Sequence, residues 1–182
     1  ELKTMQFDSV DPVARVAYMK FLKMPVAGRD IYSDGYGEMN GKLLGLIKVI
    51  FDNSRETAQS GLLTTFCEFL LVPGYLLSKN VRWEMIDNKT VRGTLTDNGI
   101  RAGALFHFNE DGLLTHVETS DRYYTEGKGE YKKVRFSAMV ESYREQGAIR
   151  IPGKMKAVWH LPGGDYEYFR GIIERVVYNV NV

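Results

Sequence analysis

Two of the three histidines, His107 and His116, lie on either side of a short Asn-Glu-Asp-Gly turn, and Glu118 follows two residues later. If the turn joins antiparallel strands, both imidazoles lie on one face of the sheet in diagonal positions. A protein zinc site needs three or four ligands, often paired at helical spacing. No H-x-x-x-H spacing occurs, and His160 is far along the chain. We therefore expect no bound metal and no other cofactor.

The residues used for covalent and acid–base catalysis form no recognisable pattern. Cys67 has no histidine at a suggestive distance, and no G-x-S-x-G sequence marks a serine nucleophile. We expect Cys67 to be a small buried residue on a helix. Most carboxylates lie in predicted turns or on the polar side of predicted strands, so no acid–base pair stands out. We predict no catalytic residue, although missing motifs do not exclude an enzyme.

Three polar residues are candidates for contact with a ligand. Glu68 interrupts an apolar helical segment, but it lies about 150° from the centre of the apolar stripe, which also suits a solvated or ion-paired carboxylate. The pairs Arg122-Tyr123 and Tyr143-Arg144 could donate hydrogen bonds to an anionic head group, or could border sheet edges and loops. We name Glu68, Arg122 and Tyr143 as candidate ligand-binding residues.

Aromatic residues give a stronger signal than the polar ones. If a helix packs on the apolar face of a sheet, six rings from the helix and the strands converge there. Their first interpretation is a hydrophobic core, and the second is an aromatic cleft for an acyl chain or another apolar ligand. The six candidates are Phe66, Phe69, Trp83, Phe106, Phe108 and Trp159.

One amphipathic helix is predicted over about residues 54–71. Asn53 and Glu56 have the spacing of a capping box, and Pro73-Gly74 ends the segment. The apolar stripe of this segment contains Ala58, Leu62, Phe66, Phe69 and Leu70.

The remaining chain alternates with a period of two, which is typical of antiparallel strands with one buried face. Strands are predicted at residues 2–7, 13–22, 43–51, 81–86, 90–96, 100–108 and 113–119, and then at 130–145, 149–161 and 168–180 within an almost continuous stretch from Glu130 to Asn181. A polar loop is predicted from Ser120 to Gly129. In the strands between 81 and 119 the predicted buried face contains Val81, Trp83, Met85, Val91, Leu95, Ala102, Ala104, Phe106, Phe108, Leu113 and Val117.

The glycine-rich passage from Gly28 to Gly45 does not match a phosphate-binding loop. The motif G-x-x-x-x-G-K-[ST] fails because the Gly-Lys pair at 41–42 is followed by Leu43. We interpret the passage as a turn with backbone bends that leads into the strand at 43–51.

Composition is that of an ordinary folded domain. The chain has 182 residues, is 44% hydrophobic, and carries 24 basic against 23 acidic residues. No run of five like charges occurs, so we expect no nucleic-acid partner. The longest apolar stretch, residues 62–77, is interrupted by Glu68 and Pro73, so no transmembrane segment is expected. The chain begins with Glu1 in a strand-like segment, which suggests that a leader, an anchor or part of the fold precedes it.

Several short motifs occur in an order that resembles an uncharacterised bacterial family, a domain of unknown function. They are E-x-x-x-x-P followed by leucines (68–77), a Trp strand (VRWEMID), F-x-F-x-x-x-G (106–112), DRYY, YREQGAIRIP (143–152) and the closing YFRG. The resemblance runs from about Phe7 to Tyr178. It implies that a membrane anchor commonly precedes this region, and Leu71 departs from the Trp that is frequent there. The arrangement is also similar to the half-barrel of periplasmic lipoprotein carriers.

These observations predict a mainly β (α+β) fold, a curved antiparallel sheet or half-barrel with one principal covering helix, in a single domain over residues 1–182 that is shortened at its N-terminal side. The leading functional hypothesis is noncatalytic binding or carriage of an apolar ligand such as a lipid or acyl chain. The alternative is a structural or partner-binding module that uses an exposed sheet edge. An enzyme of undetermined class is the third. The compartment stays open, and an extracytoplasmic or membrane-anchored full-length protein is one expectation.

Overall fold

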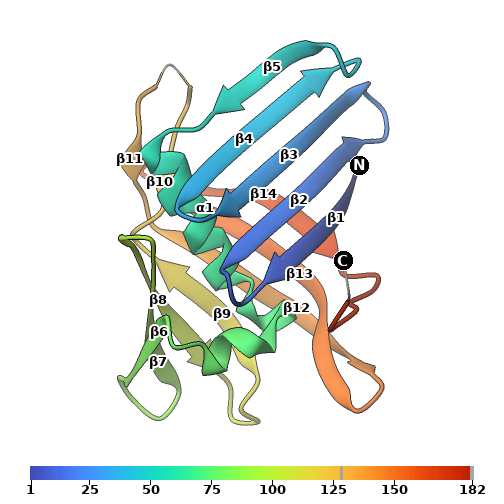
Figure 1. The fold of residues 1–182 in the computed structure, drawn as a ribbon. Helices are drawn as coiled ribbons and strands as arrows, with labels where there is room; N and C mark the ends of the chain where they lie inside the picture. The colour runs from blue at the N-terminus through green and yellow to red at the C-terminus, as the bar shows by residue number, and fades with distance from the viewer. Residues whose placement is uncertain (128, 181–182) are drawn as a thin grey trace.

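The computed structural model describes residues 1–127 and 129–180 (Figure 1). Strands contain 58% of the residues, and one α-helix accompanies them. The first sheet is formed by β1 (Leu2–Ser9), β2 (Ala14–Phe21), β3 (Val26–Ser33), β4 (Tyr36–Leu43) and β5 (Ile47–Asp52). The helix α1 (Arg55–Cys67) follows, with two 3-10 turns, η1 (Phe69–Leu71) and η2 (Pro73–Leu77). The second sheet is formed by β6 (Val81–Met85), β7 (Thr90–Asp97), β8 (Ile100–Phe108), β9 (Leu114–Thr119), β12 (Phe136–Gln146), β13 (Ile149–Leu161) and β14 (Gly164–Ile172).

Both large sheets are antiparallel, and neither closes into a barrel. The first sheet is a five-stranded meander in chain order. The second has the order β14-β13-β12-β9-β8-β7-β6. A two-stranded ribbon of β10 (Tyr123–Tyr124) and β11 (Lys132–Lys133) interrupts the connection from β9 to β12. β10 lies within the predicted polar loop, whereas β11 lies in the predicted strand at 130–145, of which only the part from Phe136 onward joins the second sheet. Lys128 of that loop lies outside the described residues. The prediction of a mainly antiparallel β fold with one helix is confirmed.

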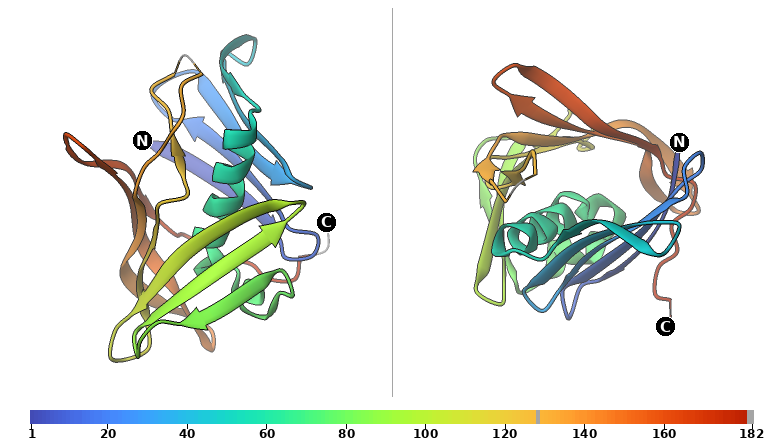
Figure 2. Two further views of the ribbon diagram at one scale, coloured as in Figure 1. Left: turned by 90° about the vertical axis from the view of Figure 1, so that its left-hand side faces the viewer. Right: turned by 90° about the horizontal axis from the view of Figure 1, so that it is seen from above.

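Helix α1 lies between the two sheets, which face one another across it (Figure 2). It packs on β3 and β4 on one side and on β8 on the other. Buried side chains are therefore found nearly all round the helix, including Leu62, Leu63 and Phe66. The two sheets also meet where the Tyr32 hydroxyl donates a 2.7 Å hydrogen bond to Asp97. The helix fixes the distance between the sheets and so defines the space between them.

The predicted cap of α1 is off by one residue. Ser54, not Asn53, is the N-cap, and its hydroxyl accepts from the Thr57 backbone N–H at 3.1 Å. Asp52 accepts from the Ser54 backbone N–H and so holds the cap in place. The helix also ends earlier than predicted, because two 3-10 turns replace its last segment before Ser78.

The prediction of a turn across the glycine-rich passage is wrong, because that passage forms β3 and β4. Gly37 is buried where β4 crosses α1, and a Cβ there would lie 2.4 Å from Ala58 Cα. The glycine lets the helix backbone approach the strand closely, which is a common use of glycine inside strands. The predicted strand at 43–51 is correspondingly shortened to β5, and Leu44-Gly45 form the turn before it.

The last predicted strand also differs. It starts at Gly164 and ends at Ile172, and the segment from Ile173 to Val180 has no regular structure. Arg144 and Gln146 donate side-chain hydrogen bonds to backbone carbonyl groups of this segment, in place of a strand ladder. Asn181, at the end of the predicted stretch, lies outside the described residues. In the described part of the chain, no helix is long and apolar enough to cross a membrane.

Candidate functional site

Four of the six aromatic candidates form one packed cluster between α1, η1 and the second sheet. Phe66, Phe69, Trp83 and Phe106 lie with ring centroids 4.8–6.0 Å apart. Phe66 and Phe106 are fully buried. A Cβ added at Gly93 would lie within 2.8 Å of three of these rings. This part of the interior is therefore filled by the protein itself.

The other two candidates lie elsewhere. Phe108 packs at the margin of the core, and Trp159 belongs to a second aromatic group. Trp159 has its ring centroid 5.0 Å from Phe136, 5.2 Å from Tyr124 and 6.2 Å from Tyr168. All six rings contribute to or pack against one hydrophobic core, but they form two separate groups of ring contacts, because four strands separate β13 from β6 in the second sheet.

Arg122 lies over this second group. Its guanidinium carbon is 4.1 Å from the Phe136 centroid and 5.2 Å from that of Trp159. One Nη donates to the Tyr168 hydroxyl at 3.2 Å, whereas the buried Nε has no hydrogen-bond partner. No carboxylate among the described residues forms an ion pair with Arg122. We call Arg122, Phe136, Trp159 and Tyr168 the Arg122 site.

A bulge in the β13–β14 pairing turns two successive aromatic residues of β14 toward the space between the sheets. Ala157 pairs with Phe169, but the next residue, Val158, pairs with Glu167, so Tyr168 is the extra residue. Such an insertion redirects side chains. Tyr168 and Phe169 remain 43% and 39% exposed although they face inward. The inner face of β14 is therefore only partly covered.

The face of the first sheet that is turned toward the second sheet is also partly exposed, in the part that α1 does not cover. On the face that packs on α1, Ile47 and Ile50 of β5 are exposed by 56% and 53%, and Leu2 and Phe21 are half-buried. Figure 2 shows that α1 occupies one side of the gap between the first sheet and strands β12–β14. Both sheets therefore carry partly exposed apolar side chains on the faces that are turned toward one another.

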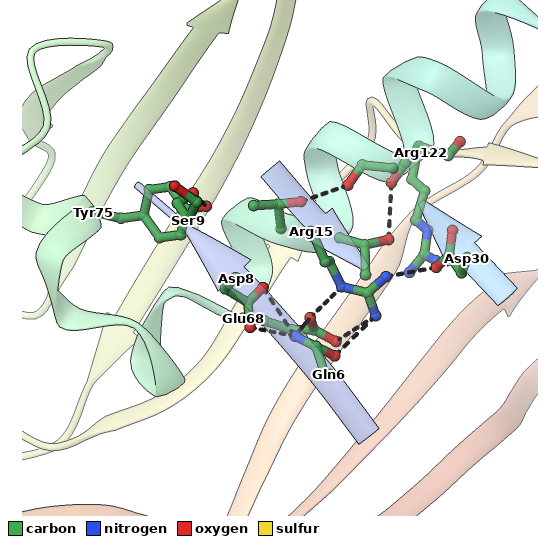
Figure 3. Close-up of polar contacts among 12 residues, drawn as sticks. Gln6, Asp8, Ser9, Arg15, Asp30, Glu68, Tyr75 and Arg122 are labelled. Atoms are coloured by element: carbon green, nitrogen blue, oxygen red, sulfur yellow. Dashed lines mark hydrogen bonds and ion pairs between the residues drawn. The ribbon is translucent and has the colours of Figure 1, made fainter. Parts of the chain in front are cut away.

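A second arginine, Arg15, is held in an ionic network at the end of α1 (Figure 3). Its Nη1 is 2.7 Å from Asp30 Oδ2, and its Nε is 2.7 Å from Glu68 Oε2. Gln6 accepts from Arg15 Nη2 and donates to both Asp8 and Glu68. Arg15 is only 6% exposed. Glu68, a predicted candidate, therefore joins the helix end to β1 and β2, and Arg15 extends the network to Asp30 on β3.

Asp8 is the strained member of this network. Burial and, to a smaller extent, the nearby Glu68 carboxylate raise its pKa to about 6, against the opposing effects of Gln6 and Arg15. Three carboxylates surround a single guanidinium, so the network holds excess negative charge when Asp8 is ionised. The sequence alone did not predict this network. The sequence feature that indicates it is the charged Arg15, which alternates with Val13 and Ala17 and therefore lies on the same buried face of the strand.

The two histidines of the Asn-Glu-Asp-Gly hairpin are directly opposite one another, not diagonal as predicted. His107 pairs with His116, and their rings stack with centroids 4.2 Å apart on the outer face of the second sheet. A register shift at the next residue explains the difference, and it also places Leu114, not Leu113, in the core. Burial and the neighbouring His107 lower the pKa of His116, which favours the neutral form of the His116 ring.

Strand pairing brings Ser137, His160 and Asp165 into the order of a hydrolytic triad. Ser137 Oγ is 2.8 Å from His160 Nε2, and His160 Nδ1 is 2.7 Å from Asp165 Oδ1. A catalytic serine must be accessible to its substrate, but Ser137 is only 1% exposed, whereas the Asp165 side chain is 68% exposed. All three lie on strands β12, β13 and β14, which pair with one another and use backbone N–H groups in that pairing. The arrangement offers no accessible nucleophile.

The two remaining candidates have structural contacts. Burial raises the pKa of the Cys67 thiol to about 12, so it stays a protonated, buried residue as expected on the helix. The Tyr143 hydroxyl donates to the Leu114 carbonyl at 2.8 Å, and burial raises its pKa. Tyr143 therefore lies apart from Arg122, and the two do not form one site.

Comparison with known proteins gives a family match and no functional assignment. A model described as "Family of unknown function (DUF6544)" matches residues 1–171. No curated protein and no solved structure matches the chain.

Proposed function

The chain belongs to the DUF6544 family of unknown function, and we propose that it binds an apolar ligand with an anionic head group, such as a fatty acid or lipid, between its two sheets. The observation that carries this proposal is the Arg122 guanidinium, which has a buried Nε without an acceptor among aromatic rings. A buried donor without a partner costs about 1–3 kcal/mol. A bound carboxylate or phosphate would remove that cost.

The chemistry of the Arg122 site favours an anion with an apolar tail. A guanidinium binds carboxylate or phosphate through two parallel hydrogen bonds, and here only one of its nitrogens has a described partner. The rings of Phe136 and Trp159 hold the guanidinium plane in place by cation–π contact. Exposed inward-facing rings such as Phe169 are suited to an acyl chain. The filled cluster around Phe66 offers no comparable space.

The first test uses the two tryptophans as separate reporters. Trp159 lies beneath Arg122, whereas Trp83 lies in the filled cluster. Titration with oleate should change the tryptophan emission of the native protein and of Trp83→Phe in a saturable manner. In Trp159→Phe the change should be lost. A flat titration of the native protein, together with no lipid in mass spectra of its organic extract, would refute the proposal.

The second test separates the head group from the tail. Arg122→Gln should weaken oleate binding by about tenfold or more, since hydrogen bonds to charged groups contribute about 1.5–3 kcal/mol. Binding of uncharged oleyl alcohol should change little. Arg135→Gln, an exposed arginine on the outer side of the same sheet region, is the matched control and should bind oleate normally. Equal losses in Arg122→Gln and Arg135→Gln would exclude a head-group role for Arg122.

A second candidate function, partner binding at a sheet edge, is favoured by β5. This edge strand exposes Ile47, Val49, Ile50 and Phe51 by 45–56%, on both of its faces. An exposed apolar edge can add a strand from another chain. Sedimentation of the native protein and of Val49→Lys over a wide concentration range tests this function. Self-association of the native protein that Val49→Lys abolishes is the expected result, and a native monomer at every concentration would argue against pairing between copies.

A further inference from the structure

Four lysines form one row across the outer face of the first sheet, which is the face turned away from α1. Strand pairing sets Lys3 directly opposite Lys20 and Lys42 directly opposite Lys48, with Ala27 between the two pairs. All four lysines are exposed, and none forms an ion pair with a described residue. Like charges directly opposite one another destabilise a sheet. Lys48 Nζ lies over the Phe51 ring, 4.0 Å from its centroid, whereas Lys3, Lys20 and Lys42 have no such contact with a described residue.

A role in protecting the sheet edges from aggregation explains only two of the four lysines. Lysines on edge strands oppose aggregation, and this reason suits Lys3 on β1 and Lys48 on β5. Lys20 and Lys42 lie on β2 and β4, which are paired on both sides. The two inner lysines therefore need another explanation, and an anionic partner is the one that their charge supplies.

The same end of the sheet presents apolar side chains beyond the strands. The β2–β3 turn exposes Leu22 and Met24 by 42% and 54%, and the β4–β5 turn exposes Leu44 and Leu46 by 64% and 85%. Both turns lie at the upper right of Figure 1, beside the start of β1. The β2–β3 turn adds a fifth lysine, and Glu1 is the one acidic residue among residues 1–5, 18–28 and 41–50.

One leucine of the β4–β5 turn has an unfavourable backbone conformation. Leu44 has φ of 54°, in the left-handed region that non-glycine residues rarely adopt. Solvent exposure of Leu44 gives no compensating burial. Between the two turns and β1 lies a groove of about 660 Å³, lined mainly by apolar side chains such as Met5, Tyr18 and Pro25, with Lys3 and Lys20 also in its wall.

We infer that this end of the first sheet docks on the surface of a bilayer that contains anionic lipid. We call the surface formed by Lys3, Lys20, Lys23, Lys42 and Lys48 with Leu22, Met24, Leu44 and Leu46 the docking rim. Basic residues near an anionic membrane are attracted to its surface potential, and exposed apolar side chains insert at the boundary between head groups and acyl chains. A nucleic acid would use the lysines but would leave the leucines in water. The docking rim does not include Arg122, so this inference stands independently of the proposed ligand.

The experiment is co-sedimentation of the purified protein with vesicles of pure phosphatidylglycerol or pure phosphatidylcholine. We expect binding to phosphatidylglycerol that weakens as salt increases, and little binding to phosphatidylcholine, because screening acts on exposed charges. Absence of binding to phosphatidylglycerol, or equal binding to both lipids, would overturn the inference.

Variants then locate the surface. Lys20→Glu/Lys42→Glu should weaken phosphatidylglycerol binding by more than about tenfold. This variant should stay folded, because each glutamate then faces a lysine across the sheet. Lys132→Glu/Lys154→Glu is the matched control, since it changes the net charge equally at exposed positions without ion pairs, and it should retain most binding.

The leucines decide between a membrane and another polyanion. Leu44→Ser/Leu46→Ser should weaken vesicle binding by several-fold or more, since each leucine removed from the interface loses burial of apolar area. If this variant binds vesicles normally, or if the native protein binds duplex DNA as tightly as it binds vesicles, the docking rim is a general polyanion surface and the inference fails.

Discussion

Arg15 and Arg122 both face the space between the sheets, but their surroundings are opposite. Arg15 is bonded to Asp30, Glu68 and Gln6, and its hydrogen bonds tie three strands to the helix end. Arg122 stacks on aromatic rings, donates to one hydroxyl and leaves its Nε without an acceptor. A cation with its full set of partners inside the protein stabilises the fold. A cation without them is available for a ligand.

The largest effect is expected at the satisfied arginine. Arg15→Gln should destabilise the protein by about 3–5 kcal/mol, because it leaves Asp8, Asp30 and Glu68 close together without their counter-charge. Urea denaturation followed by circular dichroism measures the change. Adding Glu68→Gln to this variant should recover part of the loss. If Arg15→Gln alone costs less than about 1 kcal/mol, the network is not what holds the helix end.

A smaller effect, of opposite sign, is expected at Asp8. Its folded-state pKa is raised from 3.8 to about 6, so the network favours the protonated carboxyl. The related stabilisation is present below about pH 4 and is lost as the pH rises through 6. Asp8→Asn cannot ionise, and it should therefore be more stable than the native protein by about 2–3 kcal/mol at pH 8, with little difference at pH 4.

The measurement for Asp8 is the free energy of unfolding of both proteins from pH 4 to pH 8. Asp87→Asn is a control at an exposed carboxyl whose pKa is lowered chiefly by the hydrogen bond that it accepts from the Lys89 backbone N–H, so it should not gain stability as the pH rises. A constant difference between Asp8→Asn and the native protein at all pH values would show that Asp8 does not titrate in this window.

The smallest change in stability is expected at Arg122. Arg122→Gln removes one hydrogen bond and the cation–π contacts but also an unsatisfied donor, so the net cost should be below about 1 kcal/mol. Thermal unfolding without added lipid measures it. A loss as large as that of Arg15→Gln would place both arginines in the same structural class and remove the main support for the ligand proposal.

The sequence predicted the fold class because hydrophobic periodicity is local. Alternation along residues 81–119 and 149–161 identified strands, and the stripe through Leu62 and Phe66 identified the helix. Where glycine replaces the alternating apolar residue, as at Gly37, the periodic signal disappears, and β3 and β4 were missed. The cap at Ser54 and the register of His107 were wrong by one residue, since neighbouring positions carry similar local signals.

By itself the sequence determined that strands with one buried face dominate, that one helix covers them and that Arg122 was worth naming. Tertiary structure decided which side chains surround each charged residue. Lys3, Lys20, Lys42 and Lys48 are dispersed along the chain, and only strand pairing collects them into one row. The same pairing gives Arg15 its carboxylates, while the second sheet gives Arg122 aromatic rings instead. Electrostatic energy depends on distance in space and on burial, and neither quantity is encoded in the local pattern of residues.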